Sequence, residues 1–184
     1  MMRGGLFILS GPSGVGKGTL RAELFAQMPN LAFSISCTTR HPREGEVDGV
    51  DYRFISEEQF SDLVAKDAFL EWAQVHRHRY GTLKSDVEQL RQQGRDVILE
   101  IDVQGASQVR QRVKDAKAIF VAPPTMEDLE HRLRGRGTES ESDIECRLHN
   151  AQMEMAQKDK FDLVVINRTV DEAVAELVRF MKEA

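Results

Sequence analysis

The chain has 184 residues, of which 41% are hydrophobic, enough for one domain with a buried core and too little for two ordinary domains. Its 25 basic residues are outnumbered by 30 acidic ones, and the net charge of −5 argues against a non-specific nucleic-acid binder and a polybasic membrane anchor. No apolar run approaches the ~20 residues of a membrane span, and Cys37 and Cys146 are too few for a disulfide framework. We therefore expect a cytoplasmic protein with reduced thiols that binds neither nucleic acid nor membrane.

Short apolar runs of strand length alternate with segments of helical composition along most of the chain. The runs that suit strands buried on both faces are residues 6–10, 97–101, 118–121 and 163–166. The first run is followed by a predicted helix over 19–27, which stops before Pro29. This alternation predicts an α/β fold with a mostly parallel sheet flanked by helices.

Helix starts are marked by a hydroxyl three residues before an acid or an amide. At this spacing the two side chains can satisfy free backbone N–H groups reciprocally. The hydroxyls that have it are Ser56, Ser85, Thr125, Ser142 and Thr169. Gly94 follows a segment of helical composition and predicts a helix end.

Residues 32–82 break the alternation, because they are rich in turn residues and carry aromatic pairs at strand spacing. We predict short strands there and one helix over about 56–66. The whole chain is then one domain, with a core over about 1–31 and 83–184 and an insertion over about 32–82. A polar, glycine-bearing stretch at 134–142 predicts a surface loop.

A glycine-rich loop at 11–19 follows the first predicted strand and opens the first predicted helix. Its glycines let successive N–H groups point into one concavity, its lysine can reach outer phosphates, and the helix N-terminus adds partial positive charge. Strand, loop and helix in this order predict a phosphate-binding loop. The residues expected to contact the phosphates are Gly11, Pro12, Ser13, Gly14, Val15, Gly16, Lys17, Gly18 and Thr19.

The loop departs from the usual pattern at Gly18, where a serine or threonine would offer a hydroxyl to Mg²⁺. Thr19 is the next candidate. Asp102, just after the predicted strand at 97–101, is the acid expected near the metal, acting through water. The alternative for this acid is a cap on a strand end.

The segment 36–54 places arginines, a tyrosine and several carboxylates in the turn-rich insertion. Arg40 and Arg43 carry forked donors suited to a phosphate, and Tyr52 can donate to the same group. A carboxylate can accept two N–H donors from a guanine edge, which adenine does not offer in that arrangement. A solvated loop of mixed charge is the alternative that this segment alone leaves open.

From about residue 6 to 180 the sequence resembles the guanylate kinase family. The segment that carries most of the likeness has Thr38, Thr39, Arg40, Arg43, Glu46, Gly49, Tyr52 and Phe54. Further matching motifs lie at 71–73, 80–82, 98–105, 122–124 and 134–139. The resemblance implies a P-loop kinase core, a small strand-rich GMP-binding insertion over about 32–82 and a short lid over about 134–145.

The resemblance also implies residue roles. Guanine would be contacted by Ser36, Glu71, Thr82 and Glu100. The GMP phosphate would be held by Arg40, Arg43, Tyr52 and Tyr80, with Glu46 supporting the arginines. The arginines that close on the transferring phosphate would be Arg132, Arg136 and Arg147. Asn167 would lie beside the adenine, followed by Arg168 where the family often has a polar or acidic residue. The residues expected to act in catalysis are Lys17, Arg40, Arg43, Arg136 and Arg147.

The implied reaction is the transfer of a phosphoryl group from ATP, with Mg²⁺, to GMP and also dGMP, in purine nucleotide metabolism. One alternative is a non-catalytic guanylate-kinase-like module that binds phosphopeptides, and the presence of Lys17, Arg136 and Arg147 argues against it. The other is a P-loop kinase for a different small phosphate ester, against which Glu71 and Glu100 argue. The oligomeric state is not predicted.

Overall fold

The computed structural model describes residues 2–75, 77–135 and 140–184. It contains a five-stranded sheet of order β2-β7-β1-β8-β9 and a four-stranded sheet of order β4-β3-β6-β5. Contacts divide the described chain into two units. Unit 1 comprises Met1–Leu6, Ala32–Leu99 and Gln104–Ala116, and unit 2 comprises Phe7–Leu31, Glu100–Val103 and Lys117–Ala184. Each unit is described by itself.

The strands of unit 2 run parallel. β1 (Leu6–Ser10) pairs with β8 (Lys117–Ala122), which pairs in turn with β9 (Leu163–Ile166). All five residues of β1 are buried, as a continuous apolar run requires when helices cover both faces. The predicted α/β class with a mostly parallel sheet is confirmed.

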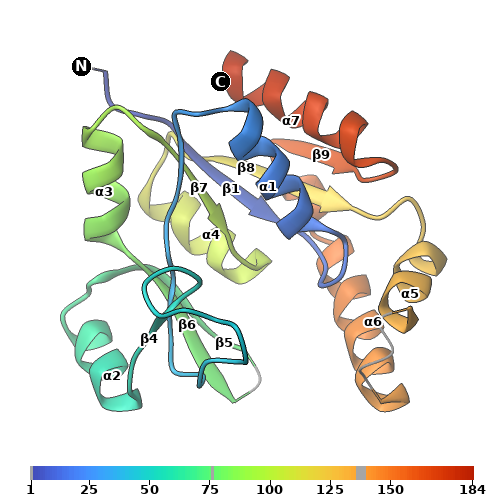
Figure 1. The fold of residues 1–184 in the computed structure, drawn as a ribbon, viewed down its shortest axis with the longest axis horizontal. Coiled ribbons are helices and arrows are strands. Elements are labelled where there is room, and N and C mark those ends of the chain that lie inside the picture. Colours follow the sequence, from blue (N-terminus) through green and yellow to red (C-terminus); the bar gives the residue numbers. More distant parts are fainter. Residues whose placement is uncertain (1, 76, 136–139) are drawn as a thin grey trace. The chain divides into compact units, whose positions relative to one another are not determined.

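Helices α1 (Lys17–Gln27) and α7 (Val170–Glu183) pack against each other in unit 2, drawn in blue and red in Figure 1. The side chains that α7 buries fall on one stripe at helical spacing: Ala173, Val174, Leu177 and Met181. The hydroxyl of Thr169 caps this helix, as predicted, by accepting from the backbone N–H of Glu172.

A second helix pair in unit 2 is formed by α5 (Met126–Arg134), which Thr125 caps as predicted, and α6 (Glu141–Met155). The predicted cap of α6 at Ser142 is wrong, because the same spacing also occurs two residues earlier. Ser140 is the cap, and its hydroxyl accepts from the backbone N–H of Asp143 at 3.2 Å. A 3₁₀ turn, η1 (Lys158–Lys160), follows α6 before β9.

The small sheet of unit 1 holds β3 (Cys37–Thr38), β4 (Arg53–Phe54), β5 (Phe69–Val75) and β6 (His78–Leu83). β6 pairs antiparallel with both β5 and β3, and β3 pairs parallel with β4. The helix α2 (Glu57–Ala65) confirms the helix predicted near 56–66, with a complete capping box at Ser56. Phe60 of this helix packs with Cys37 and Phe69 in a core of its own.

The remaining elements of the chain are β2 (Leu31–Phe33), α3 (Lys84–Gln92), β7 (Asp96–Glu100) and α4 (Val103–Arg112). The predicted cap of α3 at Ser85 is wrong, because β6 runs directly into the helix and Leu83 occupies the cap position without a side-chain bond. Gly94 follows the end of α3 with φ 75°, which confirms the predicted stop. Among the described helices, none is both long enough and apolar enough to cross a bilayer.

Candidate active site

The glycine-rich loop joins β1 to α1 in unit 2, and three of its glycines have positive φ: Gly11, Gly14 and Gly16. Gly11 has φ 139°, and a Cβ atom there would lie 2.2 Å from the backbone oxygen of Val121. Gly16 has φ 99° and forms the left-handed N-cap of α1. The chain therefore turns sharply into the helix and leaves the helix N-terminus facing the loop, which suits an anion.

Lys17 lies across this loop. Its Nζ donates to the backbone oxygens of Gly11 at 2.5 Å and Pro12 at 3.1 Å. Burial lowers the pKa of Lys17, and the carboxylates of Glu100, Glu154 and Asp102 oppose that shift in this order. The ammonium group is thus placed inside the loop where the outer phosphates are expected.

Three side chains predicted to surround ATP meet the same loop. Arg132 of α5 donates to the backbone oxygens of Val15 at 3.2 Å and Asn167 at 3.0 Å. The amide of Asn167 donates to the oxygen of Val15 at 2.9 Å, and Arg147 of α6 donates to the hydroxyl of Ser13 at 3.3 Å. Arg132 and Asn167 therefore brace the loop backbone. The predicted lid arginine Arg136 lies outside the described residues.

Three acidic side chains of unit 2 affect the pKa of Lys17. Glu100 ends β7 and accepts from the guanidinium of Arg21 at 2.8 Å, while Asp102 precedes α4. Glu154, in the last turn of α6, was missed from the sequence because it belongs to no motif. Burial raises the pKa of Glu154, Lys17 lowers it and Asp102 raises it. The charges of Lys17, Asp102 and Glu154 therefore interact electrostatically.

In unit 1, Arg40 and Glu46 form a two-point ion pair. The Nη1 and Nη2 atoms of Arg40 donate to Oε2 and Oε1 of Glu46 at 2.9 and 2.8 Å. The backbone N–H of Arg43 donates to the same carboxylate at 2.8 Å. These donors, Arg40 first, lower the pKa of Glu46 to about 2, so the carboxylate stays charged and fixes the guanidinium.

Aromatic rings enclose this ion pair. The guanidinium of Arg40 lies over the ring of Tyr52 at 5.3 Å and over that of Phe54 at 5.8 Å. Tyr52 meets Tyr80 edge-on with ring centroids 5.9 Å apart. The structure therefore brings together Arg40, Glu46, Tyr52 and Tyr80, which we call the arginine–tyrosine cluster, while the side chain of Arg43 is exposed.

A buried carboxylate lies nearby on the same sheet. Glu71 of β5 and Thr82 of β6 are paired across the strands and are only 4% and 0% exposed. The hydroxyl of Thr82 donates to Oε1 of Glu71 at 2.6 Å. A carboxylate has about four lone-pair positions, so one that accepts from a hydroxyl can also accept the N–H donors of a purine edge. Ser36, predicted to assist, is partly buried, and its backbone oxygen accepts from Arg53 at 2.9 Å.

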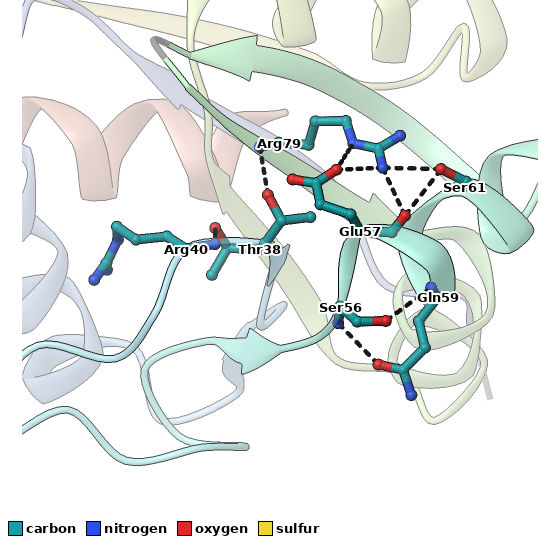
Figure 2. A network of polar contacts seen from close by, with 8 residues as sticks. Thr38, Arg40, Ser56, Glu57, Gln59, Ser61 and Arg79 are labelled. Carbon is teal, nitrogen blue, oxygen red and sulfur yellow. Dashed lines mark hydrogen bonds and ion pairs between the residues drawn. The ribbon is translucent and has the colours of Figure 1, made fainter.

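Arg79 was missed from the sequence because nothing distinguishes it from the neighbouring basic residues. Its guanidinium donates to Glu57 at 2.8 Å and to the hydroxyl of Ser61 at 2.9 Å, while its backbone N–H donates to Thr39 at 3.0 Å. Figure 2 shows these contacts, with Arg40 pointing away from them. Arg79 thus ties α2 to the strand that carries Tyr80.

A cavity of about 500 Å³ also lies in unit 1, and no predicted site residue lines it. Its basic side chains each have an acidic partner: Arg3 with Glu88, Lys84 and Arg112 with Asp67, and Arg91 with Asp115. We assign no nucleotide to this cavity, because an incoming anion would have to displace those carboxylates.

A parallel sheet with a glycine loop between β1 and α1 and a lysine inside that loop defines the class of P-loop nucleotide-binding proteins. The sequence profile of the guanylate kinase family matches residues 3–184. A guanylate kinase of Thermotoga maritima is 46% identical over 98% of this chain and 87% of its own length. One of Cutibacterium acnes is 51% identical over 95% and 88%.

Solved structures agree with this. The crystal structure of guanylate kinase from Anaplasma phagocytophilum matches with a TM-score of 0.81 at 28% identity, over 99% of this chain and 86% of that one. A shikimate kinase from Bacteroides thetaiotaomicron, 13% identical with a TM-score of 0.50 over 97% and 98%, shares the fold alone. The chain belongs to the guanylate kinase family.

Proposed function

We propose that the protein transfers the terminal phosphoryl group of ATP to GMP, giving ADP and GDP. The observation that carries this is the presence, in one chain of this family, of a lysine-bearing phosphate loop and of the arginine–tyrosine cluster. The first suits a nucleoside triphosphate and the second a nucleoside monophosphate.

On the donor side, the backbone N–H groups of 11–19 and the start of α1 hold the ATP phosphates, and Lys17 adds its charge to the outer ones. Arg147, which contacts Ser13, supplies a further charge at the edge of the loop. Arg132 and Asn167 keep the loop in shape while adenine binds beside Asn167. Arg136 is proposed to close on the transferring phosphate with the rest of the lid.

On the acceptor side, Arg40, Arg43, Tyr52 and Tyr80 bind the GMP phosphate, and Glu46 aims Arg40. Four side chains form hydrogen bonds with the guanine base: Ser36, Glu71, Thr82 and Glu100. A buried carboxylate favours a base edge with two adjacent N–H groups, so GMP and dGMP should both serve and AMP should not.

The chemical step needs charge neutralisation and positioning more than proton transfer. The GMP phosphate is already an anionic nucleophile, so no side chain has to remove a proton from it. Lys17 and the arginines stabilise the charge on the moving group, and closure over the nucleotides excludes water that would otherwise hydrolyse ATP. A pH–rate profile that reveals one essential side-chain base, mapped to this site by mutation, would contradict this.

We also propose that Mg²⁺ accompanies ATP. Among the described residues no group of three or more candidate metal-ligating side chains occurs, so a divalent ion would rely on phosphates and waters. The acidic surroundings of Lys17 are compatible with a dication, and Asp102 and Thr19 are the residues that would hold it, through water. When bound, the ion neutralises phosphate charge in the transition state.

The test is an acceptor assay that follows ADP formation with GMP, dGMP, AMP and IMP at equal concentrations. We expect GMP and dGMP to support turnover and AMP to be poor. ADP formation that does not depend on GMP, or AMP outperforming GMP, would overturn the proposal and favour a binding module or a kinase for another ester.

A cytoplasmic location is proposed as well, supported by two cysteines that are both free thiols.

A further inference from the structure

Strand β5 contains an irregularity directly before the carboxylate assigned to guanine. Along β5 and β6, Phe69 pairs with Leu83 and Glu71 with Thr82, so two steps on one strand match one step on the other. Leu70 is the extra residue of a β-bulge. A bulge bends the strand and re-aims the neighbouring side chains, so the direction of Glu71 depends on whatever holds this backbone.

β5 is an edge strand of the small sheet, so its outward backbone groups need partners other than a strand. Helix α4 supplies them. The backbone N–H of Trp72 donates to Oε1 of Gln108 at 3.1 Å, and Nε2 of Gln108 donates to the backbone oxygen of Trp72 at 2.8 Å. The side-chain amide therefore takes both hydrogen bonds that a neighbouring strand residue would take.

One helical turn further along α4, Arg112 holds the other side of the bulge. Its Nη1 donates to the backbone oxygen of Phe69 at 2.7 Å. Gln108 and Arg112 thus bracket the bulge at Trp72 and Phe69, and both contacts lie within unit 1. The bulged backbone is pinned at each end by a side chain from one helix face.

This pinning matters because the two faces of β5 differ sharply. Glu71 is 4% exposed and bonded to Thr82, whereas Trp72 is 37% exposed. A shift of one residue would exchange these side chains between the faces, removing the carboxylate from its hydroxyl partner. The two hydrogen bonds between Gln108 and the backbone of Trp72 hold this residue in the register that keeps Glu71 buried.

We propose that Gln108 is a positioning residue for guanine recognition, whose amide fixes the bulge in β5 and thereby the aim of the Glu71 carboxylate. The inference rests on the proposed function, since it assumes that Glu71 reads the base. Gln108 itself touches the backbone of Trp72 and needs no contact with the nucleotide.

The test replaces Gln108 with methionine, which has a similar shape and helix propensity and no amide. Steady-state kcat and KM are measured with GMP and with IMP, which lacks the 2-amino group of guanine. Loss of two hydrogen bonds should raise KM for GMP about 5- to 30-fold and lower the preference for GMP over IMP about 10-fold. The kcat at saturating GMP should stay within about 2-fold, because the phosphate sites are untouched.

The matched control is Gln111→Met, an exposed glutamine on the same helix, which should leave both nucleotides unaffected. A double variant of Gln108→Met with Glu71→Gln separates positioning from general damage. If Gln108 acts through Glu71, the double variant loses no more preference than Glu71→Gln alone. Equal losses of kcat/KM for GMP and IMP in Gln108→Met, or none, would overturn the inference.

If Gln108→Met does not fold, Gln108→Glu provides a second variant, because it keeps the acceptor for Trp72 N–H and loses the donor. It should lose part of the GMP preference, and an unchanged preference would overturn the inference. Failure of the wild-type enzyme to phosphorylate GMP would instead refute the proposed function, so the two failures are distinguishable.

Discussion

The phosphate loop and the arginine–tyrosine cluster are both proposed to hold phosphates, yet they are built from different materials. The loop consists of backbone N–H groups, three glycines with positive φ and a lysine folded onto backbone oxygens. The cluster consists of side chains held by an ion pair and by aromatic rings. A backbone site depends on shape, and a side-chain site depends on charge.

The largest effect is expected where the loop uses charge as well as shape. Lys17→Met removes the ammonium group that reaches the outer phosphates, and we expect kcat to fall at least about 100-fold. Single-turnover rates with ATP and GMP measure this directly. Lys182→Met, at an exposed position in the last turn of α7, is the control and should retain wild-type turnover. Near-normal turnover in Lys17→Met would contradict the proposal that the charge of Lys17 acts on the outer phosphates.

Shape is tested next, by Gly11→Ala. The new methyl group would meet the backbone of Val121 in a conformation that favours glycine, so we expect a large loss of thermal stability, about 1–3 kcal/mol or more, and weaker ATP binding. Thermal denaturation without nucleotide is the measurement. Gly18→Ala, whose methyl group would meet nothing within 4 Å, should keep the melting temperature. Equal melting temperatures for the two variants would show that close packing does not shape the loop.

Glu71→Gln tests the side-chain region at the base rather than the phosphate. One carboxylate oxygen becomes an N–H donor that faces the donors of guanine, so the ratio of kcat/KM for GMP over AMP should fall about 10- to 100-fold. Activity with each nucleotide at saturation measures how much of the loss lies in binding. A ratio that is unchanged would remove Glu71 from guanine recognition.

The charge dependence of the cluster should appear in its response to acid. The pKa of Glu46 is lowered from 4.5 to about 2, so its ion pair contributes stability in full above about pH 4.5 and loses it as pH falls towards 2. The stability difference between wild type and Glu46→Gln should therefore be constant at neutral pH and shrink below 4.5. Chemical denaturation at a series of pH values measures it, and a difference independent of pH would contradict the ion pair.

The smallest expected effect concerns the two thiols, one in each unit. Burial raises the pKa of Cys37 to about 11, and the residue is packed against Phe60 and Phe69, so it should resist alkylation in the folded protein. Cys146 is exposed and should react with iodoacetamide. Mass spectrometry of the labelled protein distinguishes them, and Cys37→Ser should leave the labelling stoichiometry unchanged. Rapid labelling of Cys37 would show that the small sheet opens.

Local patterns predicted the fold well. The buried strand at 6–10 and the glycine loop follow from an apolar run and from turn residues that adjoin it in the sequence. The α/β class follows from the alternation of such runs with helical segments. The errors are local too. Ser142 and Ser140 both have the capping spacing, and only the path of the chain decides between them.

The candidate site was predicted less completely, because several of its contacts join residues far apart in sequence. The resemblance to the family predicted that Glu46 would support Arg40, and the structure shows their ion pair. The attachment of Arg132 to Val15 and of Gln108 to Trp72 depends on tertiary packing, which no motif records.

The placement of Lys17 on the oxygens of Gly11 and Pro12 has a consequence for product release. A lysine that already donates to two acceptors must exchange them for phosphate oxygens, so the net gain on binding is smaller than the gross attraction. When the nucleotide leaves, the ammonium group can donate to the same two carbonyl oxygens again. In the proposed reaction we expect this exchange to ease the release of ADP, because product release limits the turnover of many enzymes.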